Sequence, residues 1–363
     1  MRRAIVVVGV LAGALAAAAV PAAAASQPLA PVAVDVPISA AGGWVAWSAP
    51  VAGGGFGLFA WHAGAVAQVP VAPRPQPFDV DLGTDAHGRP VATFSRCAVA
   101  PVVLRGRTEA WSGSGCRVRV VDLATGRERA GGVPRPPGTS DTTPSMWRGR
   151  IAFARRDVRR HRNVAQVMLW SPSARRLTAL AHGAMPTDCP YASGCKGMTV
   201  LGAVDGLDLG ARFAAFRWLV QAPGIVGHVA WEVRADRLPD GRSRLVGWGF
   251  LGEACTGGTD AILPSLPSAD GSDVWFTQRA TECYVDTASL VRFDADMRGA
   301  AFGPLEGEIL QSTRDGDSLY ALVAPKPQAE VDPTCAADVP CMIERLDAPA
   351  LVARAYRPRS PFY

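Results

Sequence analysis

The chain has 363 residues, with 37 Lys and Arg against 32 Asp and Glu, and a formal net charge of +5. This modest charge gives no reason to expect a nucleic-acid-binding protein. The 38 Gly and 30 Pro favour many short strands joined by turns and argue against long helices. The length allows one large repeat domain or two ordinary ones.

The N-terminus has the pattern of an export signal. Met1-Arg2-Arg3 precedes an apolar run and the small-residue site Ala23-Ala24-Ala25, which predicts a secretory signal peptide over residues 1–25. A membrane anchor is the alternative, but no positive stop-transfer flank follows the run. No Gly/Ser linker or charge block divides residues 26–363, so we expect one domain there, secreted or periplasmic, monomeric and not membrane-spanning.

A short apolar strand behind a Gly or Asp turn then recurs six times. The copies are Gly43–Trp47, Gly88–Phe94, Arg148–Phe153, Gly210–Phe216, Gly271–Phe276 and Gly316–Ala321. Some of these runs are apolar throughout, as expected for inner strands covered on both faces.

A hairpin with a small polar turn follows each strand. These turns lie at 62–64, 122–126, 171–174, 240–241, 294–296 and 347–349. Short strands repeating every 45 to 60 residues or so predict a β-propeller. We expect an all-β fold of six blades with four antiparallel strands each, although the sequence leaves seven open. Whether the C-terminal strand completes blade one also stays open.

Two phrases carry a resemblance to a known family. Asp270–Phe276 has an Asp-Gly turn before an apolar strand, and Arg175–Thr178 ends on a Leu-Thr step. Both features resemble the repeat of TolB-like (WD-type) six-bladed propellers, across most of residues 36–355. Blades one and two lack the Asp-Gly pair. The resemblance implies an exported scaffold that binds proteins or other ligands at a funnel face, and it implies no catalytic residue.

The eight cysteines fall into four pairs of neighbours along the sequence. An exported chain with an even number of cysteines favours disulfides, and sequential pairing closes each loop within one blade. The expected pairs are Cys97 with Cys116, Cys189 with Cys195, Cys255 with Cys283, and Cys335 with Cys341. Zinc binding is the alternative, but the cysteine spacing is not that of a zinc knuckle.

No recognised catalytic motif occurs, so we expect no catalytic residue, no cofactor and no metal site. The five histidines are scattered among the repeats, and the acid-rich turns lack a complete calcium loop. An alternative remains, in which acids from several blades meet in a central funnel. The candidates for that role are Asp79, Asp81, Asp205, Asp208, Glu253 and Asp273.

Charge and aromatic residues suggest where a partner could bind. The basic run Arg155–Arg162 is expected to be a solvated hairpin loop, with an anion-binding patch as the alternative. Most tryptophans fall inside strands, whereas Trp111 and Trp147 lie outside them. Together with Tyr191, these two are the expected ligand-binding residues.

The sequence thus favours an exported, non-catalytic propeller that binds a partner protein or a cell-envelope glycan. The alternative is a propeller enzyme, a hydrolase or lyase acting on a sugar or lactone in the funnel.

Overall fold

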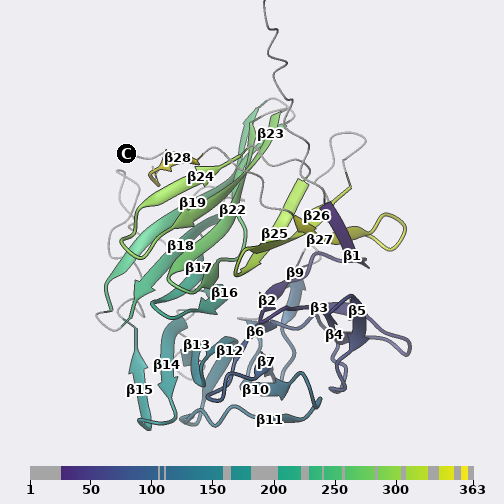
Figure 1. Ribbon diagram of the computed structural model, residues 1–363, viewed down its shortest axis with the longest axis vertical. Helices are drawn as coiled ribbons and strands as arrows, with labels where there is room; N and C mark the ends of the chain where they lie inside the picture. The colour runs from purple at the N-terminus through teal and green to yellow at the C-terminus, as the bar shows by residue number, and fades with distance from the viewer. Residues whose placement is uncertain are drawn as a thin grey trace, which may run out of the picture.

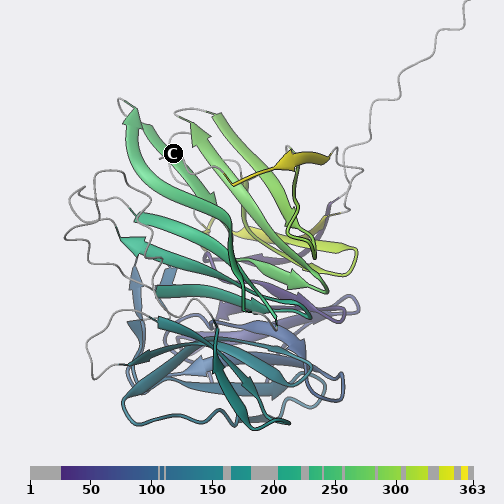
Figure 2. The same cartoon turned by 90° about the vertical axis from the view of Figure 1, so that its left-hand side faces the viewer.

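The protein is a six-bladed β-propeller in a computed structural model (Figures 1 and 2). The structure describes residues 26–104, 107–109, 112–157, 165–180, 203–221, 229–238, 241–255, 258–282, 285–303, 308–325, 335–346 and 353–358. The expected signal peptide lies outside these ranges.

The first three blades are each built from one continuous stretch of the chain. Blade one contains β2 (Ser39–Ala41), β3 (Trp44–Pro50), β4 (Phe56–His62) and β5 (Ala65–Gln68). Blade two contains β6 (Asp81–Thr84), β7 (Pro90–Arg96), β10 (Arg117–Asp122) and β11 (Glu128–Ala130), with a small hairpin of β8 (Val102–Leu104) and β9 (Arg107–Glu109). Blade three contains β12 (Thr139–Trp147), β13 (Arg150–Asp157), β14 (Ala165–Ser171) and β15 (Arg176–Ala179).

Blades four and five are joined into one continuous sheet. Blade four contains β16 (Ala203–Leu209), β17 (Phe213–Gln221), β18 (Val229–Arg237) and β19 (Ser243–Cys255). Blade five contains β21 (Ser268–Asp270), β22 (Asp273–Glu282), β23 (Val285–Phe293) and β24 (Gly299–Phe302), and β28 (Ala353–Tyr356) adds a fifth strand. Between the two blades, β20 (Gly258–Pro264) pairs with both β19 and β22.

Blade six closes the ring with a strand from the other end of the chain. It contains β25 (Glu308–Asp315), β26 (Ser318–Ala324), β27 (Cys341–Leu346) and, on its outer edge, β1 (Ser26–Val32). Ser26 pairs with Leu346, and Val32 pairs with Cys341. The described N-terminal strand therefore completes blade six, whereas blade one is built entirely from its own consecutive strands.

The six repeated apolar phrases are the second strands of the blades, β3, β7, β13, β17, β22 and β26. The interpretation of these runs as strands covered on both faces is confirmed, but they lie one strand away from the channel. The innermost strands are β2, β6, β12, β16, β21 and β25, which carry many Ser, Thr and Asp residues. Hydroxyl and carboxylate side chains gave no apolar alternation there, so the sequence pattern missed these strands.

Hydrophobic packing is divided among the seams between blades. Six separate clusters of buried residues each combine side chains from two neighbouring blades. At the seam between blades six and one, Val32 and Trp47 pack with Leu322. Each blade thus buries its faces only against its neighbours, as a propeller requires.

Strand direction separates the connections into two faces. Short turns join the first strand to the second and the third to the fourth, including Asp85–Arg89 and Asp122–Arg127. Connections between second and third strands, such as 97–116 in blade two and 325–340 in blade six, leave on the opposite side. We call that side the long-connection face, and the other side the short-turn face.

A central channel and a disulfide-fixed face

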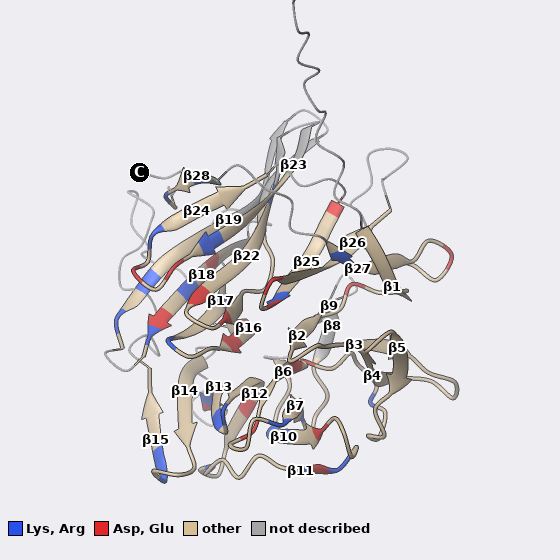
Figure 3. Ribbon diagram, viewed as in Figure 1, with Lys and Arg blue, Asp and Glu red and all other residues tan. Residues whose placement is uncertain are grey.

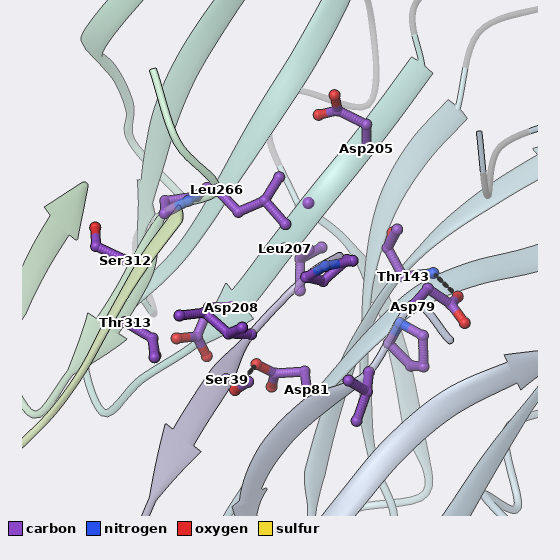
Figure 4. Close-up of a pocket in the computed structure, with 16 residues that line it drawn as sticks. Ser39, Asp79, Asp81, Thr143, Asp205, Leu207, Asp208, Leu266, Ser312 and Thr313 are labelled. Atoms are coloured by element: carbon purple, nitrogen blue, oxygen red, sulfur yellow. Dashed lines mark hydrogen bonds between the residues drawn. The ribbon is translucent and has the colours of Figure 1, made fainter. Parts of the chain in front are cut away.

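All six blades contribute to one narrow central channel (Figure 4). Its lining residues come from the innermost strands or the segments just before them, and its cavity has room for only a few water-sized molecules. The lining residues are Pro37, Ile38, Ser39, Asp79, Val80, Asp81, Thr143, Pro144, Asp205, Gly206, Leu207, Asp208, Leu266, Pro267, Ser312 and Thr313.

Six structurally equivalent positions form a ring of polar side chains around this channel. In blade order they are Ser39, Asp81, Ser145, Asp208, Ser268 and Thr313, and we call them the ring positions. At five of them, a side-chain oxygen accepts a hydrogen bond from the next blade. The donor is the backbone N–H of the residue that directly follows the ring position of that blade. The amides of Leu82, Leu209, Ala269, Arg314 and Ala40 donate these bonds over 2.7–3.3 Å.

The sixth bridge is missing, because no described backbone amide of blade three donates to Asp81. A β-bulge between Thr142 and Ser145 interrupts the pairing of β12 with β13 at this point. Thr143 within the bulge has a φ of 44°, which is unfavourable for a β-branched residue. Its amide donates to Oδ2 of Asp79 at 2.9 Å. The bulge therefore moves the link between blades two and three from Asp81 to Asp79.

Two of the four channel aspartates are neutralised by arginine. Asp79 accepts hydrogen bonds from the Ser95 amide and hydroxyl and pairs with Arg74 at 3.2 Å. Asp205 receives two hydrogen bonds from Arg217, at 2.9 and 2.8 Å. These two acids consequently hold strands together.

Asp81 and Asp208 are different, because among the described residues neither makes an ion pair. The Ser39 hydroxyl donates to Oδ1 of Asp81 at 2.8 Å, while no described group donates a hydrogen bond to Oδ2 of Asp81. Ser145 donates its hydroxyl proton to Oδ1 of Asp208 at 3.2 Å. Asp81 is buried, whereas Asp208 keeps part of its surface accessible.

The environment of this pair disfavours negative charge. Burial, and then the neighbouring carboxylate of Asp208, raise the pKa of Asp81 well above its ordinary value. Burial also raises the pKa of Asp208, to about 6. Figure 4 shows the two side chains approaching each other across the channel from β6 and β16.

Of the six acids proposed for a funnel, the structure brings four together: Asp79, Asp81, Asp205 and Asp208. Asp273 instead pairs with Arg292 at 2.8 Å on the second and third strands of blade five, away from the channel lining. The side chain of Glu253 is outside the described residues. The aspartates could be predicted because they precede or follow the recognisable apolar strands. The equally important hydroxyls at the ring positions gave no such signal.

Of the expected ligand-binding aromatic residues, Trp147 alone lies in the described part of the chain. Trp147 ends β12, packs partly buried against the core between blades three and four, and has the guanidinium groups of Arg148 and Arg150 over its ring. Trp111 and Tyr191 lie outside the described residues. The stacking contacts hold Trp147 in place, and its binding role stays a prediction.

Two of the four expected disulfides are confirmed, Cys97–Cys116 and Cys335–Cys341. The pairs Cys189–Cys195 and Cys255–Cys283 fall outside the residues whose side chains are described. Both observed bridges fix connections on the long-connection face. Gly113 lies against both sulfur atoms of the first bridge, where a Cβ would come within 2.9 Å of the Cys97 sulfur.

Exposed apolar side chains accompany both bridges. Three large hydrophobic residues are exposed in the described part of the chain: Val66 at 46%, Val99 at 61% and Val339 at 48%. Val99 belongs to the connection closed by Cys97–Cys116, and Val339 to that closed by Cys335–Cys341. Val66 lies on the outer strand β5. Thus each described disulfide fixes a loop that presents a valine to solvent.

For part of the basic run Arg155–Arg162, the structure corrects the expectation of a solvated loop. The alternative of an anion-binding patch stays a prediction. Arg155 is buried and donates to both carboxylate oxygens of Asp141, at 2.7 and 2.9 Å, while Arg156 donates to the Gly113 carbonyl at 2.8 Å. For these two residues the expected solvated loop is wrong, because they lie within strand β13 and pair with both β12 and β14. Residues 158–164 lie outside the described part. Figure 3 shows Lys and Arg spread over several blades in the face it presents.

The described residues contain neither a metal-ligand cluster nor a membrane-spanning helix. No three His, Cys, Asp or Glu side chains gather as a metal-ligand cluster within the described ranges. Over the same ranges, no helix reaches the length and apolarity that a membrane span requires.

Comparisons with known proteins give fold-level matches alone. No protein-family model matches the sequence, and no curated protein matches it either. The β-propeller domain of the Trilobed protease from Pyrococcus furiosus has a TM-score of 0.40 and 9% identity, and covers 90% of this chain and 99% of that one. Regucalcin from Agrobacterium tumefaciens has a TM-score of 0.39 and 11% identity, and covers 89% and 95%.

The tricorn protease has a TM-score of 0.39 and 10% identity, and the match covers 83% of this chain. This chain spans only 28% of the length of that protease. Similarity at this level supports no statement about activity, and what the protein does has to be argued from its own residues.

Proposed function

We propose that the protein is an exported, non-catalytic propeller that binds a partner protein or a cell-envelope glycan through its long-connection face. The observation that carries this proposal is the exposure of Val99 and Val339 in two loops that disulfides hold in shape. An exposed apolar side chain in a preorganised loop gains burial on binding and loses little conformational entropy. This agrees with the binding scaffold that the resemblance to TolB-like propellers implies.

The narrow channel also favours binding at a face. Its cavity has room for only a few water-sized molecules, so a sugar or lactone ring does not fit between the ring positions without rearrangement. Two of its acids are already held by arginine. The meeting of four aspartates is nevertheless the observation that keeps a funnel enzyme as the second candidate. A glycosidase and lactonase panel, run with and without divalent metal, tests that candidate, and turnover of any substrate would favour it.

The binding proposal is tested with three matched valine variants. Immobilised protein is incubated separately with solubilised envelope proteins and with purified envelope polysaccharide from the parent organism. Val99→Asp and Val339→Asp should each reduce capture of the retained component at least several-fold. Val66→Asp adds the same charge at a similarly exposed valine on β5 and should leave capture unchanged. Equal capture by all three variants, or no retained component in either fraction, would contradict the proposal.

A further inference from the structure

We propose that Asp81 and Asp208 together bind a hard divalent cation, such as Ca²⁺, on the axis of the propeller. The site would consist of the two carboxylates, hydroxyl groups of neighbouring ring positions and water.

The ring positions link the blades without needing the charges of Asp81 and Asp208. Ser39, Ser145, Ser268 and Thr313 accept the bridging amides with neutral hydroxyl groups. Asp208 makes the same bridge with one carboxylate oxygen, and Asp81 makes no such bridge. Structural linkage therefore leaves Oδ2 of Asp81 without a bridging role among the described residues, whereas both oxygens of Asp208 accept hydrogen bonds from neighbouring blades.

No described cation compensates the charges of Asp81 and Asp208. Arg74 and Arg217 pair with Asp79 and Asp205, and within the described ranges no cation pairs with Asp81 or Asp208. Two carboxylates facing each other in a narrow channel repel, and removing them from water is costly. A bound cation relieves both penalties, and carboxylate and hydroxyl oxygens are the ligands that Ca²⁺ prefers.

A buried hydroxyl group that lines the same cavity is also without a described partner. Oγ1 of Thr143 makes no hydrogen bond to any described residue, although Thr143 is only 5% exposed and lines the same cavity. A buried hydroxyl without a partner indicates a missing ligand or water. The cavity has room for a few water-sized molecules, which suits an ion that keeps part of its hydration shell and excludes a large ligand.

The test is equilibrium dialysis of the metal-stripped full chain at pH 7.5 against Ca²⁺, Mg²⁺ and Mn²⁺ in turn, with elemental analysis of the bound metal. The wild type should bind one equivalent of at least one of these ions. Asp81→Asn and Asp208→Asn should each weaken that binding at least tenfold. Asp317→Asn removes the same charge from a fully exposed side chain and should bind as the wild type does.

Asp81→Ser and Asp208→Ser provide a second pair should an asparagine variant fail to fold, because serine is the residue at three other ring positions. Both should fold and lose the ion. No stoichiometric metal in the wild type would overturn the proposal and would mean that the pair is neutralised by a proton. Metal binding that survives every substitution at the two positions would overturn it too, because the ion would then sit elsewhere. Neither result bears on the valine variants, so the two proposals fail separately.

Discussion

At the scale of single residues, the channel depends on close backbone contacts between neighbouring blades. Gly83 on β6 faces the carbonyl oxygen of Met146 on β12, and a Cβ at Gly83 would lie 1.7 Å from that oxygen. Backbone atoms on two different strands cannot give way as a flexible side chain can. Glycine is therefore required here for space.

We predict that Gly83→Ala destabilises the protein by about 3 kcal/mol or more, because the inner strands of blades two and three must separate. Gly271→Ala is the control. Gly271 has a φ of +59° with nothing near its missing Cβ, so only backbone strain of about 1 kcal/mol is expected. Urea unfolding of both variants gives the comparison, and a smaller loss for Gly83→Ala than for Gly271→Ala would contradict the predicted clash.

Asp79 is the residue that replaces the missing ring bridge. It accepts hydrogen bonds from both the amide and the hydroxyl of Ser95 and from the amide of Thr143, and it pairs with Arg74, whose side chain is 10% exposed. We predict that Asp79→Ala costs about 3–5 kcal/mol, since two amides lose their acceptor and the buried guanidinium loses its counterion while keeping three backbone carbonyl partners. Asp296→Ala should change stability by less than about 0.5 kcal/mol, because its ion pair is exposed. Chemical denaturation measures the free energy of unfolding of both variants. Equal losses of stability in Asp79→Ala and Asp296→Ala would rule out the linking role of Asp79.

The ionisation of Asp208 should make metal-free protein more stable in mild acid. Its pKa is raised from 3.8 to about 6 in the fold, so the folded state binds the proton more tightly than the unfolded state. The penalty of the charged form is complete above pH 6 and is relieved progressively as pH falls toward 4. The nearby channel groups are the Asp81 carboxyl, the Ser39, Ser145, Ser268 and Thr313 hydroxyls, and the arginine-paired Asp79 and Asp205.

We therefore predict that Asp208→Asn melts several degrees above the wild type at pH 7.5 in the presence of EDTA, and that the gap narrows by pH 5. Asp236, whose pKa burial also raises to about 6, contributes equally to both proteins and cancels in the difference. Thermal scans across this range measure the gap. A difference that is independent of pH would show that Asp208 does not titrate there.

At the scale of elements, the long connections gain their shape from disulfides. Cys97–Cys116 closes a loop with a sequence separation of 19, and Cys335–Cys341 closes one of 6. The Ser140 hydroxyl and Arg156 both donate to the Gly113 carbonyl, which anchors the first loop to blade three. A bridge and a neighbouring blade therefore fix the same segment.

Loop length predicts unequal stabilisation by the two bridges. On chain-entropy grounds, Cys97→Ser with Cys116→Ser should cost roughly 3 kcal/mol and Cys335→Ser with Cys341→Ser roughly 2 kcal/mol. The first pair should also become cleavable by protease within 97–116. Unfolding curves and limited proteolysis of the two double variants check this, and a larger loss from the shorter loop would contradict the entropic account.

At the scale of the whole molecule, ring closure rests on a strand from the N-terminal part of the chain. β1 pairs along its length with β27, and Ala30 and Val32 of β1 are buried at the seam between blades six and one. Without β1, the edge of β27 would present unpaired amides and carbonyls, a template for association with other chains.

We predict that Val32→Lys opens this closure. Val32 is 1% exposed, and a buried lysine without a partner should cost several kcal/mol and promote aggregation. Gln27→Lys adds the same side chain at an exposed position of the same strand and should be neutral. Size-exclusion chromatography with thermal melting compares them, and a monodisperse, equally stable Val32→Lys protein would mean that β1 is dispensable for closure.

The sequence by itself determined the all-β class, the six repeats, most of the hairpin turns and two disulfide pairs that the structure describes. These features are local: a Gly turn, an apolar run and two near cysteines impose their geometry within a few residues or one blade. The turns at 62–64, 122–126, 171–174 and 294–296 are confirmed as links between third and fourth strands. The turns at 240–241 and 347–349 fall partly or wholly outside the described residues.

Only the tertiary structure decided which strands face the axis, how the ring closes and which acids are neutralised. The hydrogen bonds that Ser39 and Thr313 accept from neighbouring blades join residues 43 and 273 positions apart in the sequence, and Ser26 pairs with Leu346. Such contacts join residues whose own neighbourhoods carry no apolar period, so nothing local marks them. For the same reason, the sequence offered six acids for a funnel. The fold distinguished Asp79 and Asp205, which arginines neutralise, from Asp81 and Asp208, whose charges face each other uncompensated among the described residues.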